Sequence, residues 1–214
     1  MLRTAPTDFE KDGWARGSEH VVGVDEVGCG PLAGPVVAAA VSLHPGQAIE
    51  GAYDSKLLTR AHREELAAVI RSEVSGFAVS AASTREVERL NVRRAAGLAM
   101  RRAIARLPFD PDLLLVDGNP MPELGEHIHI HQGDRRSLSI ACASILAKVV
   151  RDRLMELLDR RYPQYGWASN KGYATGHHLA AIRVHGPSPH HRGTFSPVVQ
   201  PELDLYSSAG ETRK

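Results

Sequence analysis

Residues 23–41 read GVDEVGCGPLAGPVVAAAV, and this stretch decides the fold of the chain. A short apolar run at residues 21–25 ends in Asp25, which is consistent with a buried strand. A glycine-rich turn follows at Gly28, Gly30 and Gly34, and the almost wholly apolar residues 36–43 predict a second strand. Two adjacent strands, followed by helices that alternate with strands, indicate a layered α/β domain with a mixed sheet.

The remaining helices and strands follow from the spacing of apolar residues. Ser83 and Glu86 match a capping box, and the pattern predicts one helix from there to about residue 107, where Pro108 stops it. A further apolar strand ends in Asp117, as the first one ends in acid. The spacing predicts strands at 77–82, 113–117 and 127–131, helices at 59–74 and 137–160, and a shorter helical stretch near 175–185.

The texture of the sequence changes at residue 161, where Gly, Pro, His and aromatic residues begin to dominate. We therefore expect four parts: a polar N-terminal arm at 1–19, a main domain at 20–160, a small helical C-terminal extension at 161–202 and a mobile tail at 203–214.

Composition describes an ordinary soluble globular protein. The chain has 214 residues, of which 43% are hydrophobic and 24% are charged. Its net charge of +1 does not indicate nucleic-acid binding, so any such binding must come from local basic patches. Two cysteines, Cys29 and Cys142, cannot form a disulfide framework, and neither a secretory signal nor a membrane-spanning run is evident. We expect a cytoplasmic protein with no membrane contact.

Four carboxylates stand where chemistry is expected. Asp25 with Glu26, and Asp117, end two strands, while Asp134 precedes the long helix. Ligands of α/β sheets gather at the carboxyl ends of strands, so three segments could deliver these groups to one place. Carboxylate oxygens suit the hard cations Mg²⁺ and Mn²⁺. The set predicts two-metal phosphodiester hydrolysis, in which ions ~3.5–4 Å apart clamp the attacking and leaving oxygens.

One difficulty concerns Asp25 and Glu26, because neighbouring residues of an ideal strand face opposite ways. They can share a site only if the strand ends or bends there, which Gly28 and Gly30 favour. Any one of these acids taken alone is more often the cap of a turn, so the assignment depends on its surroundings.

Those surroundings resemble bacterial ribonuclease HII, and the likeness covers most of residues 20–200. The matching segments keep their order and spacing, which is far more specific than a lone motif. They are GVDEVGCGPLAGPVVAAAV at 23–41, DSK at 54–56, LLLVDGN at 113–119, QGD at 132–134, ACASILAKVVRD at 141–152, PQYGWASNKGYATGHH at 163–178, HG at 185–186 and HHRGTFSPV at 190–198.

The resemblance implies a ribonuclease-H-like sheet flanked by helices, with a C-terminal extension that contacts substrate. It implies an endonuclease that cuts the RNA strand of RNA–DNA hybrids, and cuts 5′ to ribonucleotides embedded in duplex DNA, leaving 3′-hydroxyl and 5′-phosphate ends. The family's four metal-binding acids correspond to Asp25, Glu26, Asp117 and Asp134. We expect Asp25 to bridge two Mg²⁺ or Mn²⁺ ions, and the protein to act as a monomer.

The resemblance also implies which residues touch substrate. The glycine-rich turn matches the family segment that reads the ribose 2′-hydroxyl through its backbone, although the family's Gly-Arg-Gly is Gly28-Cys29-Gly30 here. Tyr173 matches a tyrosine that packs on a sugar beside the cleaved junction, and a local aromatic cluster is the alternative interpretation. Lys56 is a candidate phosphate contact, without the second lysine that often follows it in the family.

Other charged residues have plainer interpretations. Arg85, Arg89 and Arg93 recur every four residues and favour a solvated helix face over a duplex contact. Lys148 and Arg151 are expected to serve the substrate or the structure near the site. The segment His190-His191-Arg192 is expected to pack the C-terminal region against the core, and a zinc site at His127, His129 and His131 is disfavoured.

Two other functions stay open at this point. One is a different nuclease or transposase of the same fold that cuts DNA, which the glycine turn and Tyr173 argue against. Ribonuclease HIII is a nearer relative, but its long N-terminal domain contrasts with the roughly twenty residues that precede the first motif here. The other is a hybrid-binding module whose catalysis has failed through Cys29, which the four intact carboxylates argue against.

Overall fold

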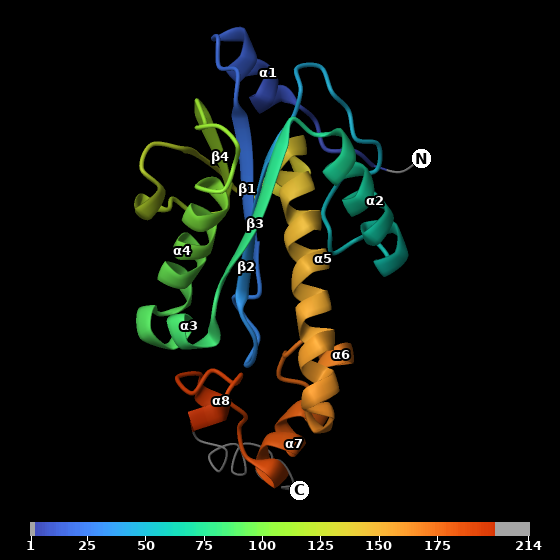
Figure 1. The fold of residues 1–214 in the computed structure, drawn as a ribbon, viewed down its shortest axis with the longest axis vertical. Coiled ribbons are helices and arrows are strands. Elements are labelled where there is room, and N and C mark those ends of the chain that lie inside the picture. The colour runs from blue at the N-terminus through green and yellow to red at the C-terminus, as the bar shows by residue number, and fades with distance from the viewer. Residues whose placement is uncertain (1–2, 200–214) are drawn as a thin grey trace, which may run out of the picture.

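A five-stranded mixed sheet forms the centre of the computed structural model, which describes residues 3–199 (Figure 1). The strand order is β3-β2-β1-β4-β5, with β1–β2 and β2–β3 antiparallel and β1–β4 and β4–β5 parallel. The predicted mixed α/β sheet is confirmed, and β1 is its central strand. The strands are β1 (Val21–Val27), β2 (Val36–Ser42), β3 (Gly76–Ala82), β4 (Leu113–Asp117) and β5 (Ile128–Ile130).

Helices cover both faces of this sheet. The predicted helices at 59–74, 137–160 and 175–185 are confirmed, and the side chains of Thr59, Ser137 and Thr175 cap them. The α-helices are α1 (Asp8–Ala15), α2 (Arg60–Glu73), α3 (Thr84–Leu90), α4 (Val92–Ile104), α5 (Leu138–Arg161), α6 (Trp167–Asn170), α7 (Gly176–His185) and α8 (Ser196–Val199). Three short 3₁₀ turns, η1 (Pro122–Leu124), η2 (Gly133–Arg135) and η3 (Pro163–Tyr165), lie between them.

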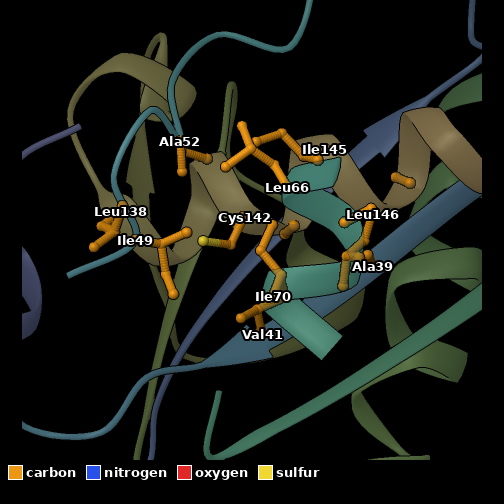
Figure 2. Packing of buried hydrophobic residues seen from close by; sticks show 14 of the residues in the cluster. Ala39, Val41, Ile49, Ala52, Leu66, Ile70, Leu138, Cys142, Ile145 and Leu146 are labelled. Atoms are coloured by element: carbon orange, nitrogen blue, oxygen red, sulfur yellow. The ribbon is translucent and has the colours of Figure 1, made fainter. Parts of the chain in front are cut away.

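The alternation of side chains along β2 divides the core into two layers. Val37, Ala39 and Val41 pack against α5 and α2, and Figure 2 shows Val41 beside Ile70 of α2 and Ala39 beside Leu146 of α5. The residues between them, Val36, Ala38 and Ala40, pack against α4 on the other face. Because β2 is buried on both faces, its sequence is apolar except for the terminal Ser42, in agreement with the strand predicted at 36–43.

One predicted helix is in fact two. The capping box of Ser83 and Glu86 is present, but α3 ends at Leu90 and α4 begins at Val92. Asn91 separates them at a φ of 67°, and its side chain accepts from the N–H of Arg94 to cap α4. Arg93 therefore lies on a different helix from Arg85 and Arg89, and it donates to the carbonyl oxygen of Pro120.

The polar N-terminal arm also contains structure that its sequence did not indicate. Residues 8–15 form α1, and its Glu10 is fully buried. Glu10 Oε1 accepts hydrogen bonds from Ser137 Oγ at 2.6 Å, Ser139 N at 2.9 Å and Ser139 Oγ at 2.7 Å. The arm is thereby attached to the first turn of α5.

A small third cluster forms beyond α5, where α6 and α7 pack near the turn between β1 and β2. Tyr165, Trp167 and Ile182 are buried there against Leu32 and Met155. The tail expected at 203–214, with residues 200–202 of the predicted extension, lies outside the described residues. Within the described part, no helix combines the length and apolar character needed to cross a membrane.

Candidate active site

Strand β1 does not end at Asp25 and Glu26. Asp25 and Glu26 pair in register with Ala39 and Ala38, and the strand continues to Val27. The expectation that the strand ends or bends at the acids is therefore wrong. Neighbouring strand positions face opposite sides, so Asp25 lies on the α5 face and Glu26 on the α4 face.

Both carboxylates still reach one place, because β4 is shorter than β1. The pairing of β1 with β4 stops at Val24 and Val116, which leaves the edge of β1 open beyond that point. Asp117, the last residue of β4, stands at this opening and interacts electrostatically with both Asp25 and Glu26. An open strand edge replaces the bend that the sequence analysis required.

Asp134 approaches from the loop between β5 and α5. It lies in η2 and is 5% exposed. The N–H of Gly133 donates to Asp117 Oδ1 at 2.6 Å, which ties this loop to the end of β4. The structure thus brings together the four carboxylates that the sequence analysis selected.

Their pKa values report this crowding. Burial, and then the charges of Glu26 and Asp117, raise the pKa of Asp25 well above its usual range. Burial and the charge of Asp117 raise the pKa of Glu26 to about 7. Burial, Asp54 and Asp117 raise the pKa of Asp134. The ionised forms repel one another, so a cation here would be strongly favoured.

The donor set fits a hard divalent cation, since it consists of carboxylates from three chain segments and the pKa values of Asp25, Glu26 and Asp134 are raised. Among residues 3–199, however, no three His, Cys, Asp or Glu side chains are already close enough together to hold a metal ion. The carboxylates are neighbours, and their side chains must turn toward a common point to share an ion.

The loop that carries DSK borders these acids. Ser55 Oγ lies 2.9 Å from Ser144 Oγ, and Ser144 in turn acts to lower the pKa of Asp25, against the larger effect of burial. Lys56 Nζ lies 4.0 Å from Asp134 Oδ2, and its side chain is 81% exposed, so its charge stands free at the rim of the site.

Asp54 is a residue that the sequence analysis missed. It is 3% exposed and accepts from Arg135 Nη2 at 2.7 Å and from the N–H of Lys56 at 3.0 Å. It therefore fixes the loop beside Asp134. The available signal was its place as the first residue of the DSK segment at 54–56.

The glycine turn is held from below by two buried arginines. Arg192 donates to the carbonyl oxygens of Gly28 at 2.6 Å, Cys29 at 2.9 Å and Gly34 at 2.9 Å. Arg151 donates to the carbonyls of Ala33, Pro35 and Lys171. Arg151 therefore serves the structure near the site, which is one of the two roles expected for it, and Arg192 joins the C-terminal region to the core, as expected.

This support turns two N–H groups outward. Across a trans peptide the C=O and the following N–H point in opposite directions, so the N–H groups of Cys29 and Gly30 point away from Arg192. Neither has a backbone acceptor within residues 3–199. The turn thus presents two backbone donors to an incoming ligand.

Cys29 supplies no charge to this turn. Burial and the neighbouring Glu26 carboxylate raise the pKa of its thiol to about 12, so it is neutral at physiological pH. Its Sγ lies 3.8 Å from Glu26 Oε1 and donates a weak hydrogen bond to it.

Tyr173 stands beside the glycine turn. The residue is 47% exposed, and a Cβ built on Gly30 would lie 3.6 Å from Tyr173 Cε1. Tyr165 and Trp167, by contrast, are buried and stacked at 5.1 Å between ring centroids. The structure brings Tyr173 to the turn, so its ring is available to a ligand there.

Comparison with known proteins agrees with this arrangement. Residues 22–198 match the family model described as Ribonuclease HII. The chain belongs to the ribonuclease HII family. A family member from Cereibacter sphaeroides is 53% identical over 186 residues, which cover 86% of this chain and 87% of that relative. Relatives at this identity identify the chain as an endoribonuclease of the ribonuclease H type.

Solved structures support the same fold. The crystal structure of ribonuclease H2 from Pyrococcus horikoshii OT3 is similar with a TM-score of 0.73 at 25% identity, over 88% of this chain and 99% of that chain. The structure of Bst-RNase HIII in complex with Mn²⁺ is similar with a TM-score of 0.67 at 21% identity, over 89% and 71% of the two chains. The latter likeness concerns the fold alone.

Two groups of residues considered for this ribonuclease HII site serve elsewhere. The ring of His127 accepts from the N–H of Met121 at 3.1 Å and lies 2.7 Å from the carbonyl oxygen of Gly125, so it fixes a loop. Lys148 forms an ion pair with Asp152 at 2.7 Å. Cys142 is fully buried in the core beside α2.

Proposed function

We propose that this member of the ribonuclease HII family hydrolyses the RNA strand of RNA–DNA hybrids and also cuts 5′ to ribonucleotides embedded in duplex DNA. The observation that carries the proposal is the meeting of four carboxylates at the open edge of β1, with a turn beside them that offers two unpaired N–H groups. Ribonucleotide and RNA primer removal are the processes that such an activity would serve.

Asp25, Glu26, Asp117 and Asp134 would hold two Mg²⁺ or Mn²⁺ ions. Such a pair supplies a hydroxide nucleophile and charge stabilisation for the departing 3′ oxygen. Asp25 has the central place, since its pKa is raised by both Glu26 and Asp117. We assign to it the bridging position.

The other residues would place the substrate. The outward N–H groups of Cys29 and Gly30 would donate to the 2′-hydroxyl and its phosphate, which separates RNA from DNA. Lys56 would bind a phosphate oxygen next to Asp134. The exposed ring of Tyr173 would pack on the deoxyribose across the cut, at the C-terminal extension that we assign to residues 161–202.

The test uses three labelled duplexes: all-DNA, DNA with one embedded ribonucleotide, and a full RNA–DNA hybrid. Each is incubated with the protein in Mg²⁺, in Mn²⁺ and in chelator, and the products are sized. We expect metal-dependent cutting of the hybrid, and a single cut 5′ to the lone ribonucleotide.

Cleavage of the hybrid but not of the single ribonucleotide would remove junction recognition from the proposal and turn attention to Cys29. Cleavage of the all-DNA duplex would contradict the role of the glycine turn. Equal cleavage in chelator would contradict the metal-binding role of the carboxylates.

A further inference from the structure

A buried chain of hydrogen bonds ends on Tyr173. His178 and His191 are 0% and 3% exposed, and their Nε2 atoms lie 3.0 Å apart. His178 Nδ1 lies 2.8 Å from the carbonyl oxygen of Tyr173. At the other end, His191 Nδ1 accepts from the N–H of Ser188 at 2.9 Å.

The partners fix where the protons are. Trp167 Nε1 lies 3.0 Å from His178 Nε2, and an indole N–H can only donate, so this Nε2 is an acceptor. His178 therefore carries its proton on Nδ1 and donates it to Tyr173. The N–H of Ser188 can likewise only donate, so His191 carries its proton on Nε2 and donates it to His178.

All donations thus run one way, from Ser188 through His191 and His178 to Tyr173. This series of hydrogen bonds is complete only while both imidazoles are neutral. Burial lowers the pKa of both rings, that of His191 to about 4, which agrees with this arrangement. The rest of the Tyr173 backbone is held as well, since its N–H donates to Asn170 at 2.9 Å.

The same support holds the glycine turn. The segment that contains His191 continues into Arg192, whose guanidinium binds the turn carbonyls and whose N–H donates to Leu32 at 2.8 Å. Ala33 and His191 also form an isolated β-bridge. Two links therefore set the position of Tyr173 relative to the turn: the N–H of Leu32, which donates to the carbonyl oxygen of Gly172 at 2.8 Å, and the pair of histidines, which acts on the carbonyl of Tyr173 itself.

We propose that His178 and His191 are positioning residues for Tyr173, which set its ring against the glycine turn and so determine how well a single ribonucleotide in DNA is distinguished from a long hybrid. This inference rests on the proposed role of Tyr173 in substrate binding. Neither histidine touches substrate, and their effect passes through the backbone of Tyr173.

The first experiment reads the histidines without substrate. Long-range ¹H–¹⁵N NMR spectra of the metal-free wild-type protein at pH 7 assign the tautomer of each ring. We expect His178 protonated on Nδ1 and His191 on Nε2. Any other pair of tautomers, or a charged ring, would show that the proposed chain of hydrogen bonds from Ser188 to Tyr173 does not exist, whatever the activity of the protein.

The second experiment reads the effect on substrate choice. We expect His178→Phe to lower the cleavage of the single-ribonucleotide duplex relative to the hybrid roughly tenfold, because the variant loses the buried hydrogen bond to the carbonyl oxygen of Tyr173. The change should appear mainly in KM. His178→Asn, which keeps a donor near Nδ1, should recover most of the ratio even if His178→Phe folds poorly. His185→Phe, at the exposed end of the same helix, is the matched control and should leave the ratio unchanged.

A double-mutant cycle with Tyr173→Ala separates the possible failures. If the histidine acts through Tyr173, the two substitutions together should change the ratio no more than Tyr173→Ala alone. Additive effects would overturn the positioning role. If Tyr173→Ala cleaved the single-ribonucleotide duplex and the hybrid in the wild-type ratio, the proposed role of the tyrosine would be refuted, and the inference with it. The NMR result would still show whether the hydrogen bonds between the two histidines and Tyr173 exist.

Discussion

The carboxylates at the open edge of β1 are placed for metal binding, but in their ionised forms they repel one another. Asp25 and Glu26 leave opposite faces of the strand, and both feel the charge of Asp117. Burial raises the pKa of each, so ionisation of both carboxylates lowers the stability of the folded, metal-free protein. Two predictions at the residue scale follow from this conflict.

The first concerns Asp25→Asn. The substitution removes one charge from the centre of the carboxylate set while preserving shape, so we expect cleavage of the RNA–DNA hybrid to fall by roughly a thousandfold or more. The melting temperature in chelator should not fall. Asp110→Asn, an exposed aspartate outside the site, is the control and should retain full activity. Near-wild-type turnover by Asp25→Asn would refute the assignment.

The second concerns Glu26→Gln and pH. The folded-state pKa of Glu26, about 7, lies above its ordinary value of 4.5, so the folded state binds more protons between these values. Stability therefore falls as pH rises through that window, by up to about 3 kcal/mol. Glu26→Gln should melt higher than wild type in chelator at pH 8, and show a much smaller difference at pH 4. Equal melting temperatures at pH 8 would show that Glu26 is not repelled.

At the scale of elements, the glycine turn has one position that cannot change and one that can. Gly28 has a φ of 97°, and a Cβ there would meet Arg151 and lie 2.8 Å from the carbonyl oxygen of Pro35. Gly30 has an ordinary φ, and a Cβ there meets only the ring of Tyr173 at 3.6 Å. The two glycines are therefore kept for different reasons.

Alanine at each position tests the difference. Gly28→Ala should lose roughly 2 kcal/mol or more of folding free energy, measured by urea denaturation, because of the strained φ and the blocked arginine. Gly30→Ala should fold normally but raise KM for the single-ribonucleotide duplex, since its methyl group narrows the space beside Tyr173. If Gly30→Ala lost as much stability as Gly28→Ala, the turn would not be built as described.

The sequence predicted elements better than their interruptions. Every strand, and the long helix α5, follow from apolar spacing that burial demands. The break at Asn91 could not be predicted, because both halves of 83–107 have helical periodicity and a positive φ leaves no mark on it. The helix α1 was missed because its anchoring carboxylate, Glu10, looks like any surface acid until Ser137 and Ser139 come near it.

The candidate site shows the same limit. The four acids could be selected from their segments, but their meeting depends on β4 being shorter than β1, which is a property of strand register. Arg192 was expected only to pack the C-terminal region. Its bonds to the Gly28 and Cys29 carbonyls join residues more than 160 positions apart, which one sequence cannot reveal.

At the scale of the whole molecule, metal binding and folding should be linked. An ion that binds only the folded state stabilises it by RT ln(1 + [L]/Kd), or about 1.4 kcal/mol at ten times Kd. We expect Mg²⁺ or Mn²⁺ to raise the melting temperature of the wild-type protein, and to raise that of Asp25→Asn much less. The same salts should affect both proteins equally if the carboxylates bind no ion.

The attachment of Glu10 to α5 bears on synthesis at the ribosome. Glu10 is made before Ser137, whose hydroxyl donates to it from 127 positions later in the chain. The central strand β1 likewise waits for β4. In the nascent chain, α1 therefore cannot form its contact with α5 until the start of α5 has left the exit tunnel. Until then the segment that contains α1 lacks its partners and is exposed to chaperones.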